Sequence, residues 1–298
     1  MPDFHGLPTR SLSNPYLRVE FLTRAGPRIV RLFLSGSSQN LLAETPDIGW
    51  PTPYGDYRLY GGHRLWCAPE AFPGSCIPDN TGLLVKEIED GVRLCQPAES
   101  ITGVLKSIDI HLRPDRPALT LRHRLKNDGL GTIECAPWAI TQLPLGGIVI
   151  LPQPAGGPDV DRLRPDRHLA LWPYTRWDDP RLHIHEASIL IEASPRSDAC
   201  KIGYWNRRGW IGYLRDGILF RKRFQPLAAV RYPDGGCNVE VYCSPRYVEI
   251  ETLSPLGPLE PGQFVTHDEI WELGTRLAAP AALDDAQTLA DLAEGELQ

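Results

Sequence analysis

Hydrophobic and polar residues alternate along most of the chain in short runs bounded by turn residues, a pattern typical of β-strands. Glycine-containing turns, such as Asn127-Asp128-Gly129 and Asp216-Gly217, separate several of the runs. Because many short strands follow one another without intervening helices, the pattern predicts an all-β fold: a large antiparallel two-sheet sandwich with a short C-terminal helix. The runs are Leu17–Leu22, Arg28–Leu34, Leu83–Ile88, Val92–Gln96, Val104–Leu112, Ala118–Lys126, Thr132–Leu143, Leu182–Glu192, Lys201–Trp205, Trp210–Leu214, Ile218–Phe224, Val239–Cys243, Tyr247–Leu253 and Phe264–Leu273.

Three stretches depart from this alternation. Asp47–Asp79 is crowded with proline, glycine and aromatic residues, which predicts a long structured loop. Pro152–Arg167 has a similar composition and predicts a second long loop. Only the acidic tail, roughly Leu283–Leu297, has apolar residues at helical spacing. We therefore expect one β-sandwich domain over residues 1–275 and an acidic helical tail over residues 276–298.

Composition and charge narrow the classes of protein that fit. The 298 residues are 42% hydrophobic and 23% charged, which is ordinary for a globular domain. The net charge is −6 and the 31 basic residues are scattered, so the positive stripe of a nucleic-acid-binding surface is missing. No apolar run approaches the ~20 residues that span a bilayer, and no signal peptide is evident. Seven cysteines without a C-x-x-C pair fit reduced thiols, so we expect a cytoplasmic protein. From the charge distribution and the short apolar runs, we expect that it binds neither nucleic acid nor membrane.

Paired carboxylates are the first candidate for chemistry. Side chains alternate along a strand, so Glu249 and Glu251 share one face of the run Tyr247–Leu253, about 7 Å apart. Two like charges at that distance raise at least one pKa, which suits a general acid or base. Two exposed carboxylates on a solvated face would give the same pattern.

A lysine in an apolar row is the second candidate. Lys222 shares a strand face with the apolar residues of Ile218–Phe224, and a buried lysine needs a partner. Glu240, Glu249 or Glu251 could supply it. The alternative is a lysine at a sheet edge whose ammonium extends to water.

The first predicted loop contains the third candidate, the segment Tyr60–Glu70. Its paired glycines let the backbone approach a ligand closely. His63 and Arg64 can hydrogen-bond hydroxyl groups, Trp66 offers a flat face to a sugar ring, and Glu70 adds a carboxylate. Binding residues often lie on loops, which favours a functional role over a loop that is merely anchored by a buried tryptophan.

The sequence predicts no metal and no cofactor. His183 and His185 share a strand face, but zinc needs a third ligand, and Glu192 lies on the other face. His123 alternates with leucines, which favours a histidine of the core. Phosphate-binding loops, the dinucleotide fingerprint and the G-x-S-x-G motif are all missing from the sequence.

The C-terminal motifs resemble a known superfamily. "VEIETLSPL" followed by "LEPGQFVTHDEIWEL" resembles the closing strands of aldose 1-epimerases, the galactose mutarotases, and "GGHRLW" resembles an early loop of the same proteins. From about Leu17 to Leu273, the order of these motifs with "APWAITQL" and "YPDGGCNVEVYCSPRY" is similar to the bacterial DUF4380 family of that superfamily. The resemblance implies a large sandwich that binds carbohydrate on its concave face.

The resemblance also implies residue roles. Glu251 takes the place of the general base that removes the proton of the anomeric hydroxyl, and His63 and Arg64 inherit contacts to the sugar. Mutarotases carry a mid-chain histidine as general acid, but the comparable strand here reads Trp138-Ala-Ile-Thr-Gln142. Either His63 or another group replaces that acid, or the epimerase reaction is lost.

The resulting expectation is a carbohydrate-binding protein, with an aldose 1-epimerase-like isomerase as the specific hypothesis. Glu251 is the expected base and His63 the expected acid. The other expected substrate contacts are Arg64, Trp66, Glu70, Trp138, Lys222 and Glu249. Two alternatives remain open: a non-catalytic sugar-binding or sensing domain, and a different reaction on an anionic sugar in the same cleft. The sequence leaves the identity of the sugar and the oligomeric state open.

Overall fold

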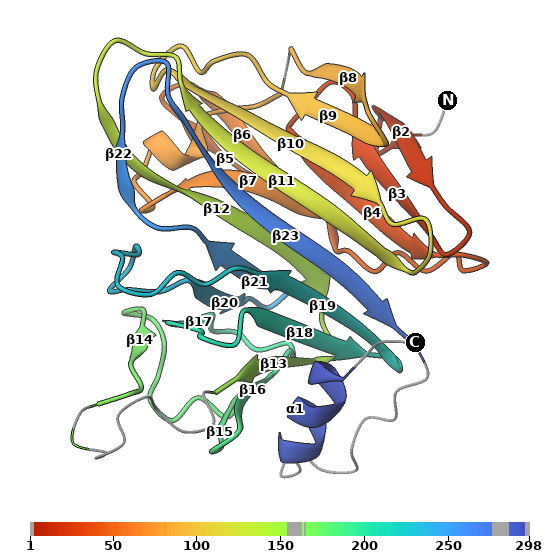
Figure 1. Ribbon diagram of the computed structural model, residues 1–298, viewed down its shortest axis with the longest axis vertical. Helices are drawn as coiled ribbons and strands as arrows, with labels where there is room; N and C mark the ends of the chain where they lie inside the picture. The colour runs from red at the N-terminus through yellow and green to blue at the C-terminus, as the bar shows by residue number, and fades with distance from the viewer. Residues whose placement is uncertain (1–2, 81, 154–162, 164, 276–285, 296–298) are drawn as a thin grey trace.

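The computed structural model describes residues 3–80, 82–153, 163, 165–275 and 286–295. Two large antiparallel sheets make up the fold (Figure 1). In spatial order the first sheet contains β1 (Asp3–Phe4), β2 (Leu7–Ser13), β3 (Leu17–Leu22), β4 (Arg28–Leu34), β7 (His63–Ala68), β12 (Ile133–Pro144), β21 (Tyr247–Leu253), β20 (Val239–Cys243), β17 (Cys200–Tyr204) and β14 (Leu169–Leu171), and β22 (Gly257–Leu259) pairs with β12.

The second sheet has the same antiparallel pairing. In spatial order it contains β15 (Leu182–Ile184), β16 (Ser188–Glu192), β13 (Ile148–Pro152), β18 (Trp210–Arg215), β19 (Ile218–Phe224), β23 (Phe264–Gly274), β11 (Ala118–Asn127), β10 (Val104–Leu112), β9 (Gly91–Cys95) and β8 (Leu84–Ile88). A hairpin of β5 (Glu44–Thr52) and β6 (Gly55–Gly61) forms a separate small sheet, and a 3₁₀ turn covers Gly74–Cys76. The predicted antiparallel sandwich is confirmed.

One sequence prediction about local structure was wrong. The segment Asp47–Asp79 is not one long loop, because it contains most of the β5–β6 hairpin and the whole of β7. Strand β7 lies near the centre of the first sheet, between β4 and β12. Most of the second predicted loop, Pro152–Arg167, lies outside the described residues.

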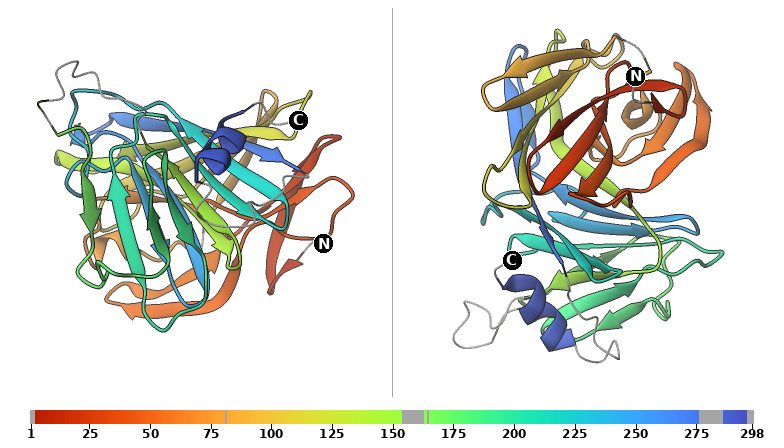
Figure 2. Two further views of the ribbon diagram at one scale, coloured as in Figure 1. Left: turned by 90° about the horizontal axis from the view of Figure 1, so that it is seen from below. Right: turned by 90° about the vertical axis from the view of Figure 1, so that its right-hand side faces the viewer.

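Alternation along the strands divides each sheet into a core face and an outer face. The inward side chains of the two sheets meet in one hydrophobic core, to which β21 contributes Val248 and Ile250, and β11 contributes Leu119 and Leu121. The opposite side chains of β21, including Glu249, point to the outer face of the first sheet. A single strand therefore serves both the core and the outer surface. Figure 2 shows the fold from two further sides, with the strands of the N-terminal part of the chain (red and orange) uppermost in the right-hand view.

Helix α1 (Ala286–Glu294) packs on the outer face of the second sheet, where Leu289 and Ala293 join a small apolar cluster. Arg221 fixes its end: one guanidinium nitrogen donates to the carbonyl oxygens of Ala293 and Gly295, at 2.5 and 2.9 Å. Within the described residues, no helix is long and apolar enough to cross a membrane. The helical part of the predicted tail is confirmed for these residues.

A buried polar cluster lies between the two sheets, and an ion pair is at its centre. Lys222 and Glu269 are both fully buried, and the ammonium lies 2.7 Å from the carboxylate. Trp271 donates its indole N–H to the other carboxylate oxygen at 2.8 Å, and the Thr252 hydroxyl also donates to Glu269. His267 completes the cluster, since its Nε2 lies 2.7 Å from the Thr252 oxygen. Burial, the largest single influence, would raise the pKa of Glu269, but Lys222 and the neighbouring polar groups together outweigh burial and lower this pKa.

The hydrogen bonds of this cluster assign the protons of its histidines. His123 Nδ1 must donate, because its partner at 2.8 Å is the backbone carbonyl oxygen of His267. Burial lowers the pKa of His123, so the ring is neutral and its Nε2 accepts. His63 Nε2 therefore donates to it across 2.7 Å, and His63 Nδ1 accepts from the Thr141 hydroxyl at 2.9 Å. The assignment of His123 to the core is confirmed.

Breaking the central ion pair tests its role. We expect Glu269→Gln to lower the free energy of unfolding by about 3–5 kcal/mol, because it leaves the Lys222 ammonium buried without a counter-charge. The measurement is urea unfolding followed by tryptophan fluorescence. The double variant Lys222→Met/Glu269→Gln should regain much of the loss, and Glu87→Gln, at an exposed position, is the control. Equal stability of Glu269→Gln and Glu87→Gln would contradict this role.

The neutral histidines predict a dependence on pH. Burial lowers the pKa of His267 to about 3, whereas an unfolded histidine titrates near 6.5. Below about pH 6.5 the His267 imidazole therefore binds a proton in the unfolded chain but not in the folded protein, so the free energy of unfolding falls as the pH drops. We expect the wild type to lose up to ~1.4 kcal/mol per pH unit more than His267→Gln between pH 6.5 and 5. The measurement is urea unfolding at several pH values, and parallel curves for the two proteins would refute it.

Candidate functional site

A cleft of about 420 Å³ opens on the outer face of the first sheet. Its floor comes from β7, β12, β21, β20 and β17, which are consecutive in the sheet although they are distant in sequence. The β5–β6 hairpin and the residues that follow β7 and β14 complete its walls. The lining residues are Trp50, Leu59, Arg64, Trp66, Glu70, Trp138, Ile140, Tyr174, Ala199, Lys201, Tyr242, Tyr247 and Glu249.

Aromatic rings form much of this cleft. Trp66 and Trp138 come from neighbouring strands and meet edge to face, with their ring centres 5.5 Å apart. Trp66 also donates its indole N–H to the hydroxyl of Tyr57 at 2.8 Å, which fixes the orientation of its ring. The ring centres of Tyr242 and Tyr247 lie 6.1 Å apart. The structure thus brings Trp66 and Trp138 together in the lining of the cleft, and their role as substrate contacts stays a prediction.

An arginine–carboxylate pair lies on the floor. Arg64 Nη2 donates to Glu249 at 2.9 Å, and the guanidinium lies 4.5 Å above the Trp66 ring. Burial raises the pKa of Glu249, although Arg64 opposes the shift. The Nε and Nη1 groups of Arg64 are buried and have no hydrogen-bond partner. Because buried donors are almost always paired in folded proteins, these two groups point to a missing acceptor.

Lys201 on β17 is a site residue that the sequence reasoning missed. Its ammonium lies 2.7 Å from Glu240 and 3.1 Å from Glu251, and it lies 4.6 Å from the centres of both the Trp138 and the Trp172 rings. The alternation of β17 could have placed Lys201 opposite the buried core side chains. Its partners could not have been found in that way, because they come from other strands.

Glu251, the expected base, lies beneath the cleft rather than on its surface. The side chain is fully buried, and one of its oxygens accepts from the Trp138 indole at 2.7 Å and from Lys201. The second oxygen has no hydrogen-bond partner. Glu240 lies at the same depth, and burial raises its pKa well above the usual range. Lys201 therefore separates these two carboxylates from the open part of the cleft.

Glu70 lies at the mouth of the cleft. It follows β7 by two residues, and the side chain is exposed. The surrounding protein nevertheless raises its pKa, chiefly by restricting its hydration, and the charge of Glu251 adds to the shift. Among the described residues, no arginine, lysine or histidine forms an ion pair with Glu70.

The structure does not bring His63 and Lys222 to the cleft. Alternation along β7 turns Arg64 outward and His63 inward, where it is fully buried in the cluster between the sheets. Glu251 faces the opposite side of the sheet, so the two residues of the expected acid–base pair do not share a cleft. Lys222 points inward from the second sheet, and its partner is Glu269 rather than the carboxylates expected from the sequence.

One group of residues has the composition of a metal site. The ligand atoms of His63, His123 and Glu269 lie within 4.8 Å of one another, and the described residues contain no other group of three such side chains. Their protons and lone pairs are already used in the network between the sheets, and the Lys222 ammonium contacts Glu269. These three side chains are therefore better explained as members of a hydrogen-bond network than as ligands of a divalent cation.

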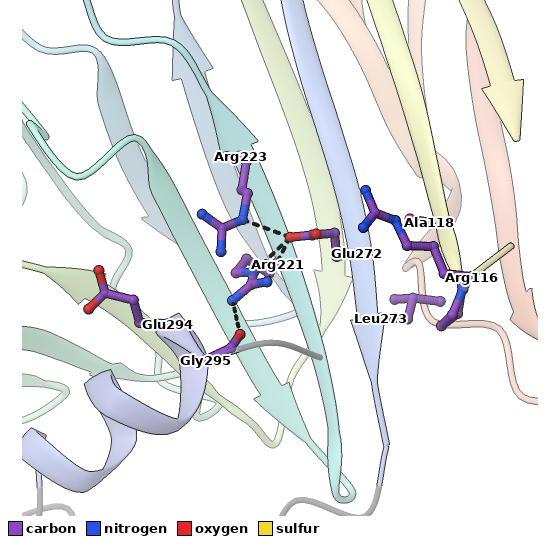
Figure 3. Close-up of a pocket in the computed structure, with 9 residues that line it drawn as sticks. Arg116, Ala118, Arg221, Arg223, Glu272, Leu273, Glu294 and Gly295 are labelled. Carbon is purple, nitrogen blue, oxygen red and sulfur yellow. Dashed lines mark hydrogen bonds and ion pairs between the residues drawn. The ribbon is translucent and has the colours of Figure 1, made fainter. Parts of the chain in front are cut away.

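A second cavity, of about 330 Å³, lies on the outer face of the second sheet (Figure 3). Glu272 accepts from Arg221 at 2.9 Å and from Arg223 at 2.8 Å, and Arg221 also binds the end of α1. These contacts serve to dock the helix. The cavity therefore has a structural explanation that the cleft lacks.

The comparisons with known structures identify the fold. The chain is similar to a proposed aldose 1-epimerase from Escherichia coli K12, with a TM-score of 0.56, 12% identity and coverage of 91% of this chain and 100% of the other. A galactose mutarotase-like protein from Lactobacillus casei has a TM-score of 0.57 at 10% identity, with coverage of 89% and 100%. A proposed mutarotase from Salmonella typhimurium has a TM-score of 0.58 at 12% identity, with coverage of 91% of both chains.

The protein thus has the galactose mutarotase-like sandwich fold. At these identities the likeness defines the fold alone. No family model matches the chain, and no curated protein matches its sequence. The resemblance to DUF4380 proteins remains a prediction from the motifs.

Proposed function

We propose that the cleft on the first sheet binds a small carbohydrate. The observation that carries the proposal is Arg64, a buried guanidinium in an aromatic-walled cleft with two N–H groups that lack acceptors. Sugar hydroxyl oxygens would accept hydrogen bonds from these groups, and Glu249 beside them would accept a hydrogen bond from a sugar hydroxyl. The Trp66 and Trp138 rings offer apolar surface to the C–H groups of the sugar. A cleft of about 420 Å³ is also within the size range of small-molecule sites.

An aldose 1-epimerase-like reaction is the second candidate, and the carboxylates around the cleft favour it. Ring opening needs a base at the anomeric hydroxyl and an acid at the ring oxygen. Strand β21 supplies Glu249 on the floor and Glu251 beneath it, so either is a candidate for the base. Glu70, whose pKa is raised, is the candidate acid in place of His63. The fold shared with proposed mutarotases supports this reaction over an unrelated one.

Direct binding tests the first proposal. We expect Arg64→Lys to weaken sugar binding by about tenfold to a hundredfold, because a lysine cannot present two N–H groups in the planar geometry of a guanidinium. Binding is measured by saturation-transfer NMR and titration with a panel of reducing sugars. Arg10→Lys, at an exposed position, is the control. If no sugar binds to the wild type, or if both variants bind equally well, the proposal is wrong.

Anomer exchange separates catalysis from binding. If the cleft is an epimerase, the protein accelerates exchange between the two anomers in proton NMR, and removal of the base lowers the rate by about 10²–10⁴-fold. Glu249→Gln and Glu251→Gln are compared to identify that base. Binding without accelerated exchange would exclude the reaction and leave a binding or sensing domain.

A further inference from the structure

The charges around the cleft are unequal, and this asymmetry carries information about the ligand. Two cations, Arg64 and Lys201, line the cleft together with the carboxylates Glu70 and Glu249. Glu240 and Glu251 lie directly beneath Lys201. Among the described residues that form this site, four carboxyl groups thus face two cations, and burial raises the pKa of one of the four, Glu240, well above its usual range.

Both cations are already paired. Arg64 is held by Glu249, and Lys201 is shared between Glu240 and Glu251. Neither has spare charge for an anionic ligand, although Arg64 keeps two N–H groups for neutral acceptors. Low-dielectric walls strengthen the resulting negative potential in the cleft.

Glu70 is the carboxylate without a counter-charge. It lines the cleft and forms no ion pair among the described residues, and desolvation by the surrounding protein is the main cause that raises its pKa, with Lys201 partly opposing the shift. A positive charge on a ligand would stabilise the ionised form of the Glu70 carboxylate. An uncompensated carboxylate at the mouth of a ligand cleft therefore favours a cationic group in the ligand.

The aromatic walls suit the same group. An ammonium is attracted to the face of a tryptophan or tyrosine ring, and more strongly where water is excluded. The protein itself shows this, because the Lys201 ammonium lies 4.6 Å from the centres of the Trp138 and Trp172 rings. Tyr174 and Tyr242 extend the aromatic surface, with ring centres 6.3 Å apart.

We propose that the carbohydrate bound in this cleft is an amino sugar, a monosaccharide with a primary ammonium group, and that Glu70 binds the ammonium. This inference rests on the proposed sugar-binding function. The sugar hydroxyls face Arg64 and Glu249, as for a neutral sugar. By this proposal the negative cleft disfavours uronic acids and sugar phosphates, which argues against the alternative of an anionic sugar.

Matched ligands test the proposal. Glucosamine, glucose, N-acetylglucosamine and glucuronic acid, with their galacto counterparts, are titrated at about pH 6.5 in low salt. N-acetylglucosamine keeps the nitrogen but removes its charge. We expect the amino sugar of one series to bind at least tenfold more tightly than its neutral and N-acetyl counterparts, and the uronic acid to bind most weakly. Added salt should reduce the preference.

Glu70→Gln separates this inference from the general function. The variant should reduce the ratio of amino-sugar to neutral-sugar affinity to less than about threefold, whereas the control Glu87→Gln, which removes an exposed carboxylate on β8, keeps the wild-type ratio. Equal affinities for charged and neutral sugars in the wild type, or tighter binding of the uronic acid, would overturn the inference and leave sugar binding intact. Failure of every sugar to bind would overturn both.

Discussion

The ion pair of Lys222 with Glu269 holds the floor of the cleft from behind. Besides contacting Glu269, the Lys222 ammonium lies 3.2 Å from the carbonyl oxygen of Ala139 and 3.4 Å from that of Ile250. These carbonyls belong to β12 and β21, so a side chain of the second sheet ties two central strands of the first. Their neighbours Trp138 and Glu251 point to the other side, into the site. The buried pair therefore positions side chains of the candidate site that it never touches.

The cleft has two layers of charge that serve different purposes. The lower layer is nearly closed to solvent, and its two carboxylates, Glu240 and Glu251, share the single ammonium of Lys201. The upper layer contains the unpaired donors of Arg64 and the exposed carboxylate of Glu70, which forms no ion pair among the described residues. Because a buried donor without a partner destabilises a fold, the two unpaired nitrogen groups of Arg64 beside the cleft argue for a ligand.

Strand alternation explains what could be predicted from the sequence. The runs Ile218–Phe224, Val239–Cys243 and Tyr247–Leu253 coincide with β19, β20 and β21, because their apolar residues alternate regularly. Alternation also placed Glu249 and Glu251 on one face. Alternation failed for β5 to β7, because prolines, glycines and aromatic residues obscure the alternating pattern of apolar and polar residues there. Since this segment was interpreted as a loop, its side chains could not be assigned to the two faces of a sheet. His63 and Arg64 were therefore grouped although they lie on opposite sides of the sheet.

Pairing between distant strands explains what the sequence could not supply. Glu269 becomes the partner of Lys222 because β19 and β23 lie side by side, and Lys201 meets its carboxylates because β17, β20 and β21 are consecutive in the sheet. The same arrangement bears on the reaction. A proton transfer to Glu251 requires Trp138 or Lys201 to move, whereas Arg64 and Glu249 already line the cleft. Binding is therefore the function that this geometry supports most directly, and catalysis would depend on carboxylates that already face the cleft.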